Sequence, residues 1–75
     1  MDENKAVVVK NLETLLRSTR AYPYINLDYV KKEVNGRTLY EYVDITMEHQ
    51  EFYHKRINVT GNSGKAIIKD VMANL

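Results

Sequence analysis

The chain has no cysteine, no tryptophan, one proline and three glycines among its 75 residues. Without cysteine, neither a disulfide nor a thiolate zinc site can stabilise the fold. A domain of this size buries only about 60% of the surface of its unfolded chain. Small domains without such cross-links often gain stability by association. We therefore expect one small domain over residues 1–75 and hypothesise a homodimer.

Neither positive nor negative charge dominates, because 11 Lys and Arg accompany 10 Asp and Glu and the formal net charge is +1. A dedicated duplex-binding domain usually carries a clear basic excess, so this balance counts against one. No apolar run approaches the ~20 residues that cross a bilayer. Asp2 and Glu3 are acidic at the end where a signal peptide would be basic. We expect a cytoplasmic protein without membrane partners.

Two segments have the spacing of amphipathic helices. The first extends from about Glu3 to Thr19, with Asp2 as its expected cap. Its expected apolar stripe consists of Val8, Leu12, Leu15 and Thr19, widened by Val9 and Leu16. The second begins near Ser63, a good N-cap, and continues to the C-terminus. Its expected stripe consists of Ile67, Ile68, Val71, Met72 and Leu75.

Asn35-Gly36 is the clearest local signal, since this pair favours a two-residue type I′ turn. The flanking residues 29–34 and 37–47 are rich in β-branched and aromatic types and largely alternate in polarity. A two-residue loop predicts that Tyr29 pairs with Tyr42 and that the remaining pairs follow toward the turn. A third strand is expected over Lys55–Val59, with Ile57 and Val59 toward the core.

In this register the two faces of the hairpin differ. The expected core face carries Val30, Val34, Leu39, Val43, Ile45 and Met47. The expected open face carries Tyr29, Lys31, Tyr40 and Tyr42. Tyrosine is enriched at protein interfaces, so these four residues form a candidate protein-interaction surface. Cross-strand packing is the alternative explanation for tyrosines on an open sheet face.

The order helix–strand–strand–strand–helix predicts an α+β fold. We expect a two-layer α-β-β-β-α domain, with a three-stranded antiparallel sheet and both helices packed on one face. The sequence shows no repeats, linkers or low-complexity segments that would indicate another arrangement.

Motifs for catalysis or metal binding are incomplete. The turn Gly61–Lys65 differs from a P-loop, because Val59 replaces the first required glycine and Ala66 replaces the Mg²⁺-binding Ser or Thr. His49, Glu51 and His54 lack zincin spacing and are too few for a closed tetrahedral site. We expect no catalytic residues, no metal, no cofactor and no enzymatic activity.

The junction between the third strand and the second helix is a candidate anion site. A glycine-containing turn before a helix presents backbone N–H groups at a positive helix end. Candidate contacts for an anion or a nucleic acid are Ser63, Gly64, Lys65, Lys69, Lys55 and Arg56. The alternative is a capped helix start in which glycine permits the turn, with no ligand.

The stretch Ser63-Gly64-Lys65-Ala66-Ile67-Ile68 is similar to the Ser-Lys-Lys-x-Ala-Lys pattern that begins the second helix of double-stranded-RNA-binding domains. The element order also resembles that family across nearly the whole chain. Ser63 and Lys65 match the pattern, whereas Gly64 and Ile68 replace lysines that would contact phosphates. A tight Asn35-Gly36-Arg37 turn replaces the family's Gly-Pro-x-His loop. The resemblance implies nucleic-acid binding as an alternative function.

The leading hypothesis is a small non-enzymatic binding protein that acts through protein–protein contacts. Small chains of this kind, without cross-links, are common among phage and mobile-element accessory proteins, and this association adds to the hypothesis. The alternatives are a nucleic-acid-binding module and binding of phosphate or another small anion at the start of the second helix.

Overall fold

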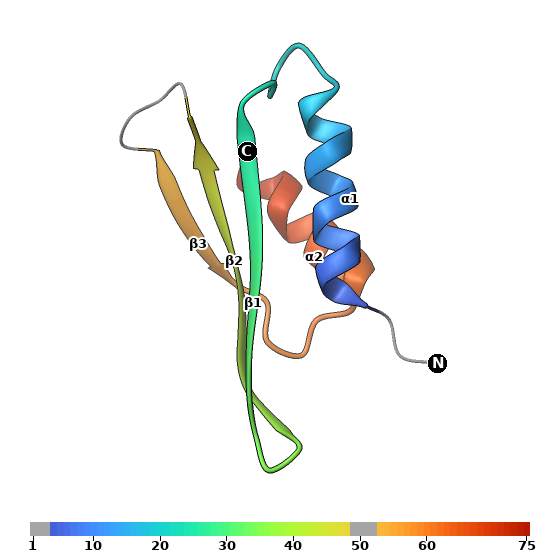
Figure 1. The fold of residues 1–75 in the computed structure, drawn as a ribbon, viewed down its shortest axis with the longest axis vertical. Helices are drawn as coiled ribbons and strands as arrows, with labels where there is room; N and C mark the ends of the chain where they lie inside the picture. Colours follow the sequence, from blue (N-terminus) through green and yellow to red (C-terminus); the bar gives the residue numbers. More distant parts are fainter. Residues whose placement is uncertain (1–3, 49–52) are drawn as a thin grey trace.

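The computed structural model describes residues 4–48 and 53–75 as a sheet with a layer of helices beside it (Figure 1). In chain order the elements are α1 (Lys5–Arg17), β1 (Ile25–Val34), β2 (Arg37–Met47), β3 (His54–Asn58) and α2 (Gly64–Ala73). The strands are antiparallel in the order β1-β2-β3, and both helices lie on one side of them. The predicted two-layer α+β fold is confirmed.

Both helices begin after a residue whose side chain caps the first turn. Ser63 is the cap of α2, as predicted, and its Oγ accepts a hydrogen bond from Ala66 N at 3.2 Å. In α1 the cap is Asn4, whose Oδ1 accepts from Val7 N at 3.2 Å. The prediction of Asp2 as cap is therefore wrong, and Asp2 itself lies outside the described residues. Each cap satisfies one of the N–H groups that a helix start leaves without a partner.

One apolar cluster lies between the sheet and the helices. It consists of Val9, Leu12 and Leu16 from α1, Ile67 and Val71 from α2, and Ile25, Leu27, Val43, Ile45, Ile57 and Val59 from the sheet and its end. The predicted positions of Ile57 and Val59 are confirmed. Leu15 is 63% exposed, and Ile68 and Met72 are also exposed. Thr19 is exposed too and lies beyond the end of α1, so the predicted stripes are wrong at these four positions.

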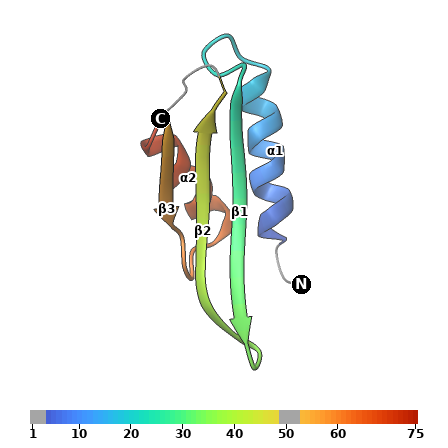
Figure 2. The same cartoon turned by 60° about the vertical axis from the view of Figure 1, so that its left-hand side comes forward.

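Glu13 explains why the buried side of α1 differs from the predicted stripe. Its side chain is buried, and Oε2 accepts a hydrogen bond from Leu27 N at 2.7 Å. In Figure 2, α1 lies beside β1 at the edge of the sheet. A strand edge exposes unpaired N–H groups, and Glu13 satisfies one of them. The helix turns Glu13 toward β1, which leaves Leu15 on the outside.

The turn at Asn35-Gly36 is confirmed, since the two residues have positive φ values of 52° and 75°. Next to the turn, Val34 pairs with Arg37 and Glu33 with Thr38. The register then shifts between Lys32 and Glu33, so Lys32 pairs with Tyr40 and Leu39 is left without a partner. This is a β-bulge, one extra residue in β2.

The bulge reverses part of the predicted face assignment. Tyr29 now pairs with Val43 on the side of the helices, and Val30 pairs with Tyr42 on the open side. The predicted pairing of Tyr29 with Tyr42 is therefore wrong, because a shift of one residue moves a strand's side chains to the other face. Tyr29, Lys31 and Val30 were predicted on the wrong face. Val34 and Leu39 were expected in the core and are exposed.

The core explains why a bulge is required. A two-residue turn after Val34 pairs odd-numbered residues of β1 with even-numbered residues of β2. The buried residues of β1 are Ile25 and Leu27, and those of β2 include Val43 and Ile45, all odd-numbered. One extra residue in β2 brings the two buried rows onto the same face.

The hairpin of β1 and β2 extends beyond the rest of the molecule (Figure 1). β3 pairs only with residues Tyr42–Thr46 of β2. The residues from Lys31 to Tyr40, which we call the hairpin arm, are all exposed. The arm therefore contributes little to the core and is presented to solvent.

We expect Glu13→Ala to lower the free energy of unfolding by ~1–3 kcal/mol, because Leu27 N loses its acceptor in a buried position. Glu13→Gln keeps an acceptor oxygen and should recover most of this loss. Urea denaturation followed by circular dichroism measures the effect. The exposed Asn11→Ala on the same helix is the control and should change stability by less than ~0.5 kcal/mol. Equal stabilities of Glu13→Ala and Asn11→Ala would contradict the role given to Glu13.

Candidate protein-interaction surface

The face of the sheet opposite the helices carries a cluster of Tyr40, Tyr42 and Arg56. The rings of Tyr40 and Tyr42 meet edge to face, with centroids 5.7 Å apart. The guanidinium carbon of Arg56 lies 4.0 Å from the ring centroid of Tyr42, in cation–π contact. Tyrosine and arginine are, together with tryptophan, the residue types enriched among the residues that contribute most to binding at protein interfaces. We call these three residues the tyrosine–arginine surface.

Asp44 holds Arg56 in place. The two residues are directly opposite each other on β2 and β3. Arg56 donates from Nε to Oδ1 at 2.8 Å and from Nη2 to Oδ2 at 3.2 Å, which is a bidentate pair. These hydrogen bonds lower the pKa of Asp44 and outweigh the opposing effect of its partial burial, and His54 adds to the lowering. The guanidinium is thereby held in a fixed orientation.

A shallow recess lies beside this surface. It is lined by Tyr40, Glu41, Tyr42, Arg56 and Asn58, and its volume is about 350 Å³. The recess is open to solvent, whereas sites for small molecules usually enclose most of the ligand.

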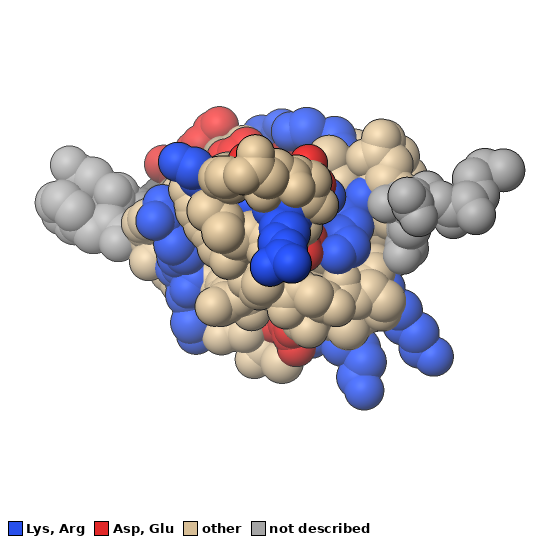
Figure 3. Space-filling model, turned by 90° about the horizontal axis from the view of Figure 1, so that it is seen from below, with Lys and Arg blue, Asp and Glu red and all other residues tan. Residues whose placement is uncertain are grey.

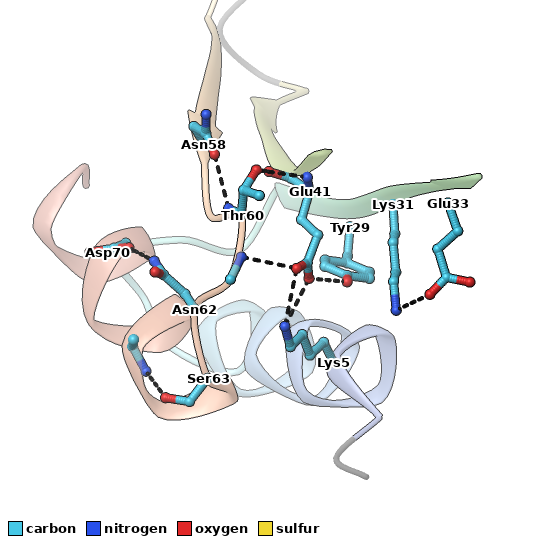
Figure 4. Close-up of polar contacts among 12 residues, drawn as sticks. Lys5, Tyr29, Lys31, Glu33, Glu41, Asn58, Thr60, Asn62, Ser63 and Asp70 are labelled. Atoms are coloured by element: carbon cyan, nitrogen blue, oxygen red, sulfur yellow. Dashed lines mark hydrogen bonds and ion pairs between the residues drawn. The ribbon is translucent and has the colours of Figure 1, made fainter. Parts of the chain in front are cut away.

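The other face of the hairpin contains a buried polar cluster around Glu41 (Figure 4). Glu41 is 2% exposed. Its carboxylate accepts from Lys5 Nζ at 2.9 Å, from Gly61 N at 3.1 Å and from the hydroxyl of Tyr29. The cluster joins α1, β1, β2 and the turn before α2.

The charges of this cluster are mutually stabilised. Burial alone raises the pKa of Glu41, but the hydrogen bonds from Tyr29, Lys5 and Gly61 outweigh it and the pKa is lowered. Burial, followed by the hydrogen bond to Glu41, raises the pKa of Tyr29. The hydroxyl of Tyr29 is therefore engaged inside the fold. Tyr29 and Lys31 do not share a face with Tyr40 and Tyr42, and Lys31 Nζ lies 2.7 Å from Glu33 Oε1.

The six candidate anion contacts are not gathered in one place. Ser63 is occupied by capping and Gly64 is buried. Lys65 and Lys69 lie exposed one turn apart on α2. Lys55 and Arg56 are neighbours on β3, so their side chains point to opposite faces of the sheet. Seen along the arm, Lys and Arg side chains are spread around the molecule with carboxylates between them (Figure 3).

Sequence reasoning missed both acidic anchors. The contact of Asp44 with Arg56 depends on the β2–β3 register, which the turn between these strands did not reveal. Glu41 had a readable signal, since it shares its parity with Val43 and Ile45 and therefore their face. A glutamate in a buried row predicts a positively charged partner, because buried charges are paired. Here the partner is Lys5, which is far from Glu41 in the sequence, so no local motif identifies it.

Within the described ranges 4–48 and 53–75, no cluster of three or more His, Asp or Glu side chains is placed to hold a metal ion. His49 and Glu51 lie outside those ranges. In the same part of the chain, neither helix is long and apolar enough to cross a membrane.

We expect Glu41→Gln to destabilise the fold by ~2–4 kcal/mol at neutral pH, because Lys5 loses the charge that compensates it. The folded-state pKa of Glu41 lies below its ordinary value of 4.5. Its contribution is therefore complete above about pH 4.5 and is lost as the pH falls through the folded-state pKa. The difference in unfolding free energy between wild type and variant should be constant near neutrality and shrink in acid.

The matched control is Glu33→Gln, which removes an exposed carboxylate from the arm and should cost at most ~0.5 kcal/mol. Asp44 titrates in acid in every variant and cancels from the difference. A difference between wild type and Glu41→Gln that does not depend on pH would show that the charge of Glu41 is not what stabilises the cluster.

Comparison with known proteins gives no further assignment. No protein-family model matches the chain, and neither a curated protein nor a solved structure matches it.

Proposed function

We propose that this chain is a small, non-enzymatic, cytoplasmic binding protein that recognises a protein partner through its tyrosine–arginine surface. One observation carries the proposal: Tyr40, Tyr42 and Arg56 lie together on the sheet face opposite α1 and α2, and Asp44 fixes the arginine. Of the four residues predicted for the interaction, Tyr40 and Tyr42 stay in the proposed site. Tyr29 and Lys31 are not part of it, because they lie on the other face of the sheet, and Arg56 is added to it.

Rigidity supports a binding role for this surface. Binding costs side-chain entropy, and side chains that are already ordered lose less of it. Tyrosine offers a large contact area with only two rotatable side-chain bonds. Arg56 is held by two hydrogen bonds and a ring contact, although its side chain is 55% exposed. An exposed arginine held in this way is suited to contact a partner.

The proposal includes a homodimer as one form of the partner, since the core is small and lacks cross-links. Size-exclusion chromatography with light scattering measures the mass. The accessory role in a phage or mobile element belongs to the same proposal and depends on the identity of the partner.

We expect the double variant Tyr40→Ala/Tyr42→Ala to lose the partner. The immobilised full chain is incubated with an extract of its native cells, and captured proteins are quantified by mass spectrometry. Recovery of the specific partner should fall by roughly tenfold or more, since residues of this kind dominate binding energy. The same variant should dissociate the homodimer if the partner is a second copy.

The control is Tyr24→Ala, which removes an exposed tyrosine from the connection before β1. It should leave recovery unchanged. The proposal fails if both variants capture the same proteins in the same amounts and the light-scattering mass is that of a monomer in both.

Nucleic-acid binding is the second candidate, and one observation favours it. The start of α1, the start of α2 and the hairpin turn all lie toward the same end of the molecule (Figure 1). Of these elements, the hairpin turn carries Arg37 and the start of α2 carries Lys65, with Lys69 one turn further along α2, whereas Lys5 and Arg56 are engaged by Glu41 and Asp44. Three elements converging on one end suit an extended polyanion, as the resemblance to double-stranded-RNA-binding domains implies.

Binding through this end should weaken steeply with salt, because bound cations are released from the nucleic acid. We expect Lys65→Glu to lower affinity for duplex RNA about tenfold at low salt. Fluorescence anisotropy at several salt concentrations measures both effects. Arg20→Glu, an equal change of charge at an exposed position beyond the end of α1, is the control. Affinity that does not depend on salt, or an equal loss in the two variants, would exclude this second function.

A further inference from the structure

The arm leaves one edge of β2 uncovered. β3 ends its pairing at Tyr42, and the chain then turns away, with Val59 N donating to Glu41 O at 3.0 Å. From Arg37 to Tyr40, β2 pairs with β1 alone among the residues that the structure describes. Leu39 has no partner residue in either ladder. Figure 2 shows this stretch of β2 continuing past the end of β3.

We propose that this edge of β2 binds an extended, acidic segment of the protein partner as an added strand in line with β3. The inference rests on the proposed function and specifies the kind of partner. In strand addition, backbone hydrogen bonds supply affinity and side-chain contacts supply specificity. The recess lined by Tyr40, Tyr42, Arg56 and Asn58 lies beside the same edge and receives a side chain of the added strand.

Charge identifies the segment as acidic. The arm contains Lys31, Lys32 and Arg37 but only one carboxylate, Glu33, which Lys31 engages. Lys32 and Arg37 form no ion pair within residues 4–48 and 53–75. Arg37 lies on the uncovered stretch of β2 itself, and Lys32 lies one strand away, opposite Tyr40. Acidic side chains on a partner strand would meet Arg37 and the positive potential that Lys32 adds, and complementary charge guides the choice of partner.

The same charges argue against a second copy of this chain at this edge. Two arms paired through this edge of β2 would bring Arg37 of each copy to the same interface, with Lys32 of each copy one strand behind it. Like charges and β-bulges are the devices by which sheet edges avoid pairing with one another. The bulge at Leu39 and the cations therefore restrict the edge to a segment of complementary charge.

Exposed apolar residues of the arm complete the match. Val34, Leu39 and Tyr40 are 44%, 58% and 38% exposed. An added strand has side chains alternating between the two faces, so a segment that alternates acidic and β-branched residues can offer both kinds of contact. The partner segment is thus acidic, extended and alternating.

The test uses the full ¹⁵N-labelled chain and three capped octapeptides, which alternate glutamate with valine, lysine with valine, or glutamate with proline. Proline cannot donate to a strand ladder, so the third peptide keeps the acidic charge and loses strand pairing. We expect the glutamate–valine peptide to shift the amide resonances of residues 37–40 and to slow exchange of the Leu39 amide. The other two peptides should bind roughly tenfold more weakly or not at all.

The variant Lys32→Glu/Arg37→Glu should weaken binding of the glutamate–valine peptide about tenfold, whereas Lys69→Glu/Lys65→Glu on α2 should not. Circular dichroism confirms that both variants are folded. Equal binding of the glutamate–proline peptide, or shifts confined to the rings of Tyr40 and Tyr42, would overturn strand addition while leaving the tyrosine–arginine surface intact. Absence of binding by all three peptides would also overturn it. The proposed function fails separately, through unchanged capture by Tyr40→Ala/Tyr42→Ala.

Discussion

The buried carboxylate of Glu41 is the interaction on which the rest of this structure depends. Its side chain receives hydrogen bonds from Lys5, Tyr29 and Gly61. Its carbonyl oxygen accepts a hydrogen bond from Val59 N. The hydroxyl of Thr60 accepts a hydrogen bond from the N–H of Glu41 and donates one to its C=O. One residue therefore anchors the start of α1, the middle of β1 and the whole departure of the chain from β3 toward α2. In a chain without cysteine, this charged network fixes the relative positions of elements that apolar packing alone does not orient.

Glu41 also marks the boundary between two parts of the molecule. On one side of it the sheet has three strands, an apolar core and helices that cover one face. On the other side the hairpin continues as two strands, and every residue from Lys31 to Tyr40 is exposed. The tyrosine–arginine surface lies at this boundary, where β3 ends and Asn58 borders the recess. Strand addition requires an exposed sheet edge, and the uncovered arm supplies one next to a base that the core holds in place.

Much of the fold followed from local signals in the sequence. The Asn35-Gly36 turn, the Ser63 cap and the alternation of β2 each reflect preferences of the backbone within a few residues. The open-face cluster was only half predictable, because Tyr40 and Tyr42 share a strand, whereas their contact with Arg56 depends on pairing with β3. The bulge was missed because two signals conflict: the turn specifies one register and the buried residues specify the next. The conflict becomes visible when the residue numbers are compared. The turn pairs odd-numbered residues of β1 with even-numbered residues of β2, whereas Ile25, Leu27, Val43 and Ile45 are all odd-numbered and share one face.

The conflict links the fold to the proposed site. Burial of the apolar rows on both strands stabilises the fold by more than the loss of one regular pair in the ladder costs. The core therefore determines the register, and the extra residue lies in the arm. The extra residue, Leu39, lies where neither helix nor β3 can cover it. The bulge leaves this residue without a partner and increases the local twist, which limits indiscriminate pairing along the edge. The requirement that aligns the core therefore also produces the irregular, positively charged edge at which we place the partner.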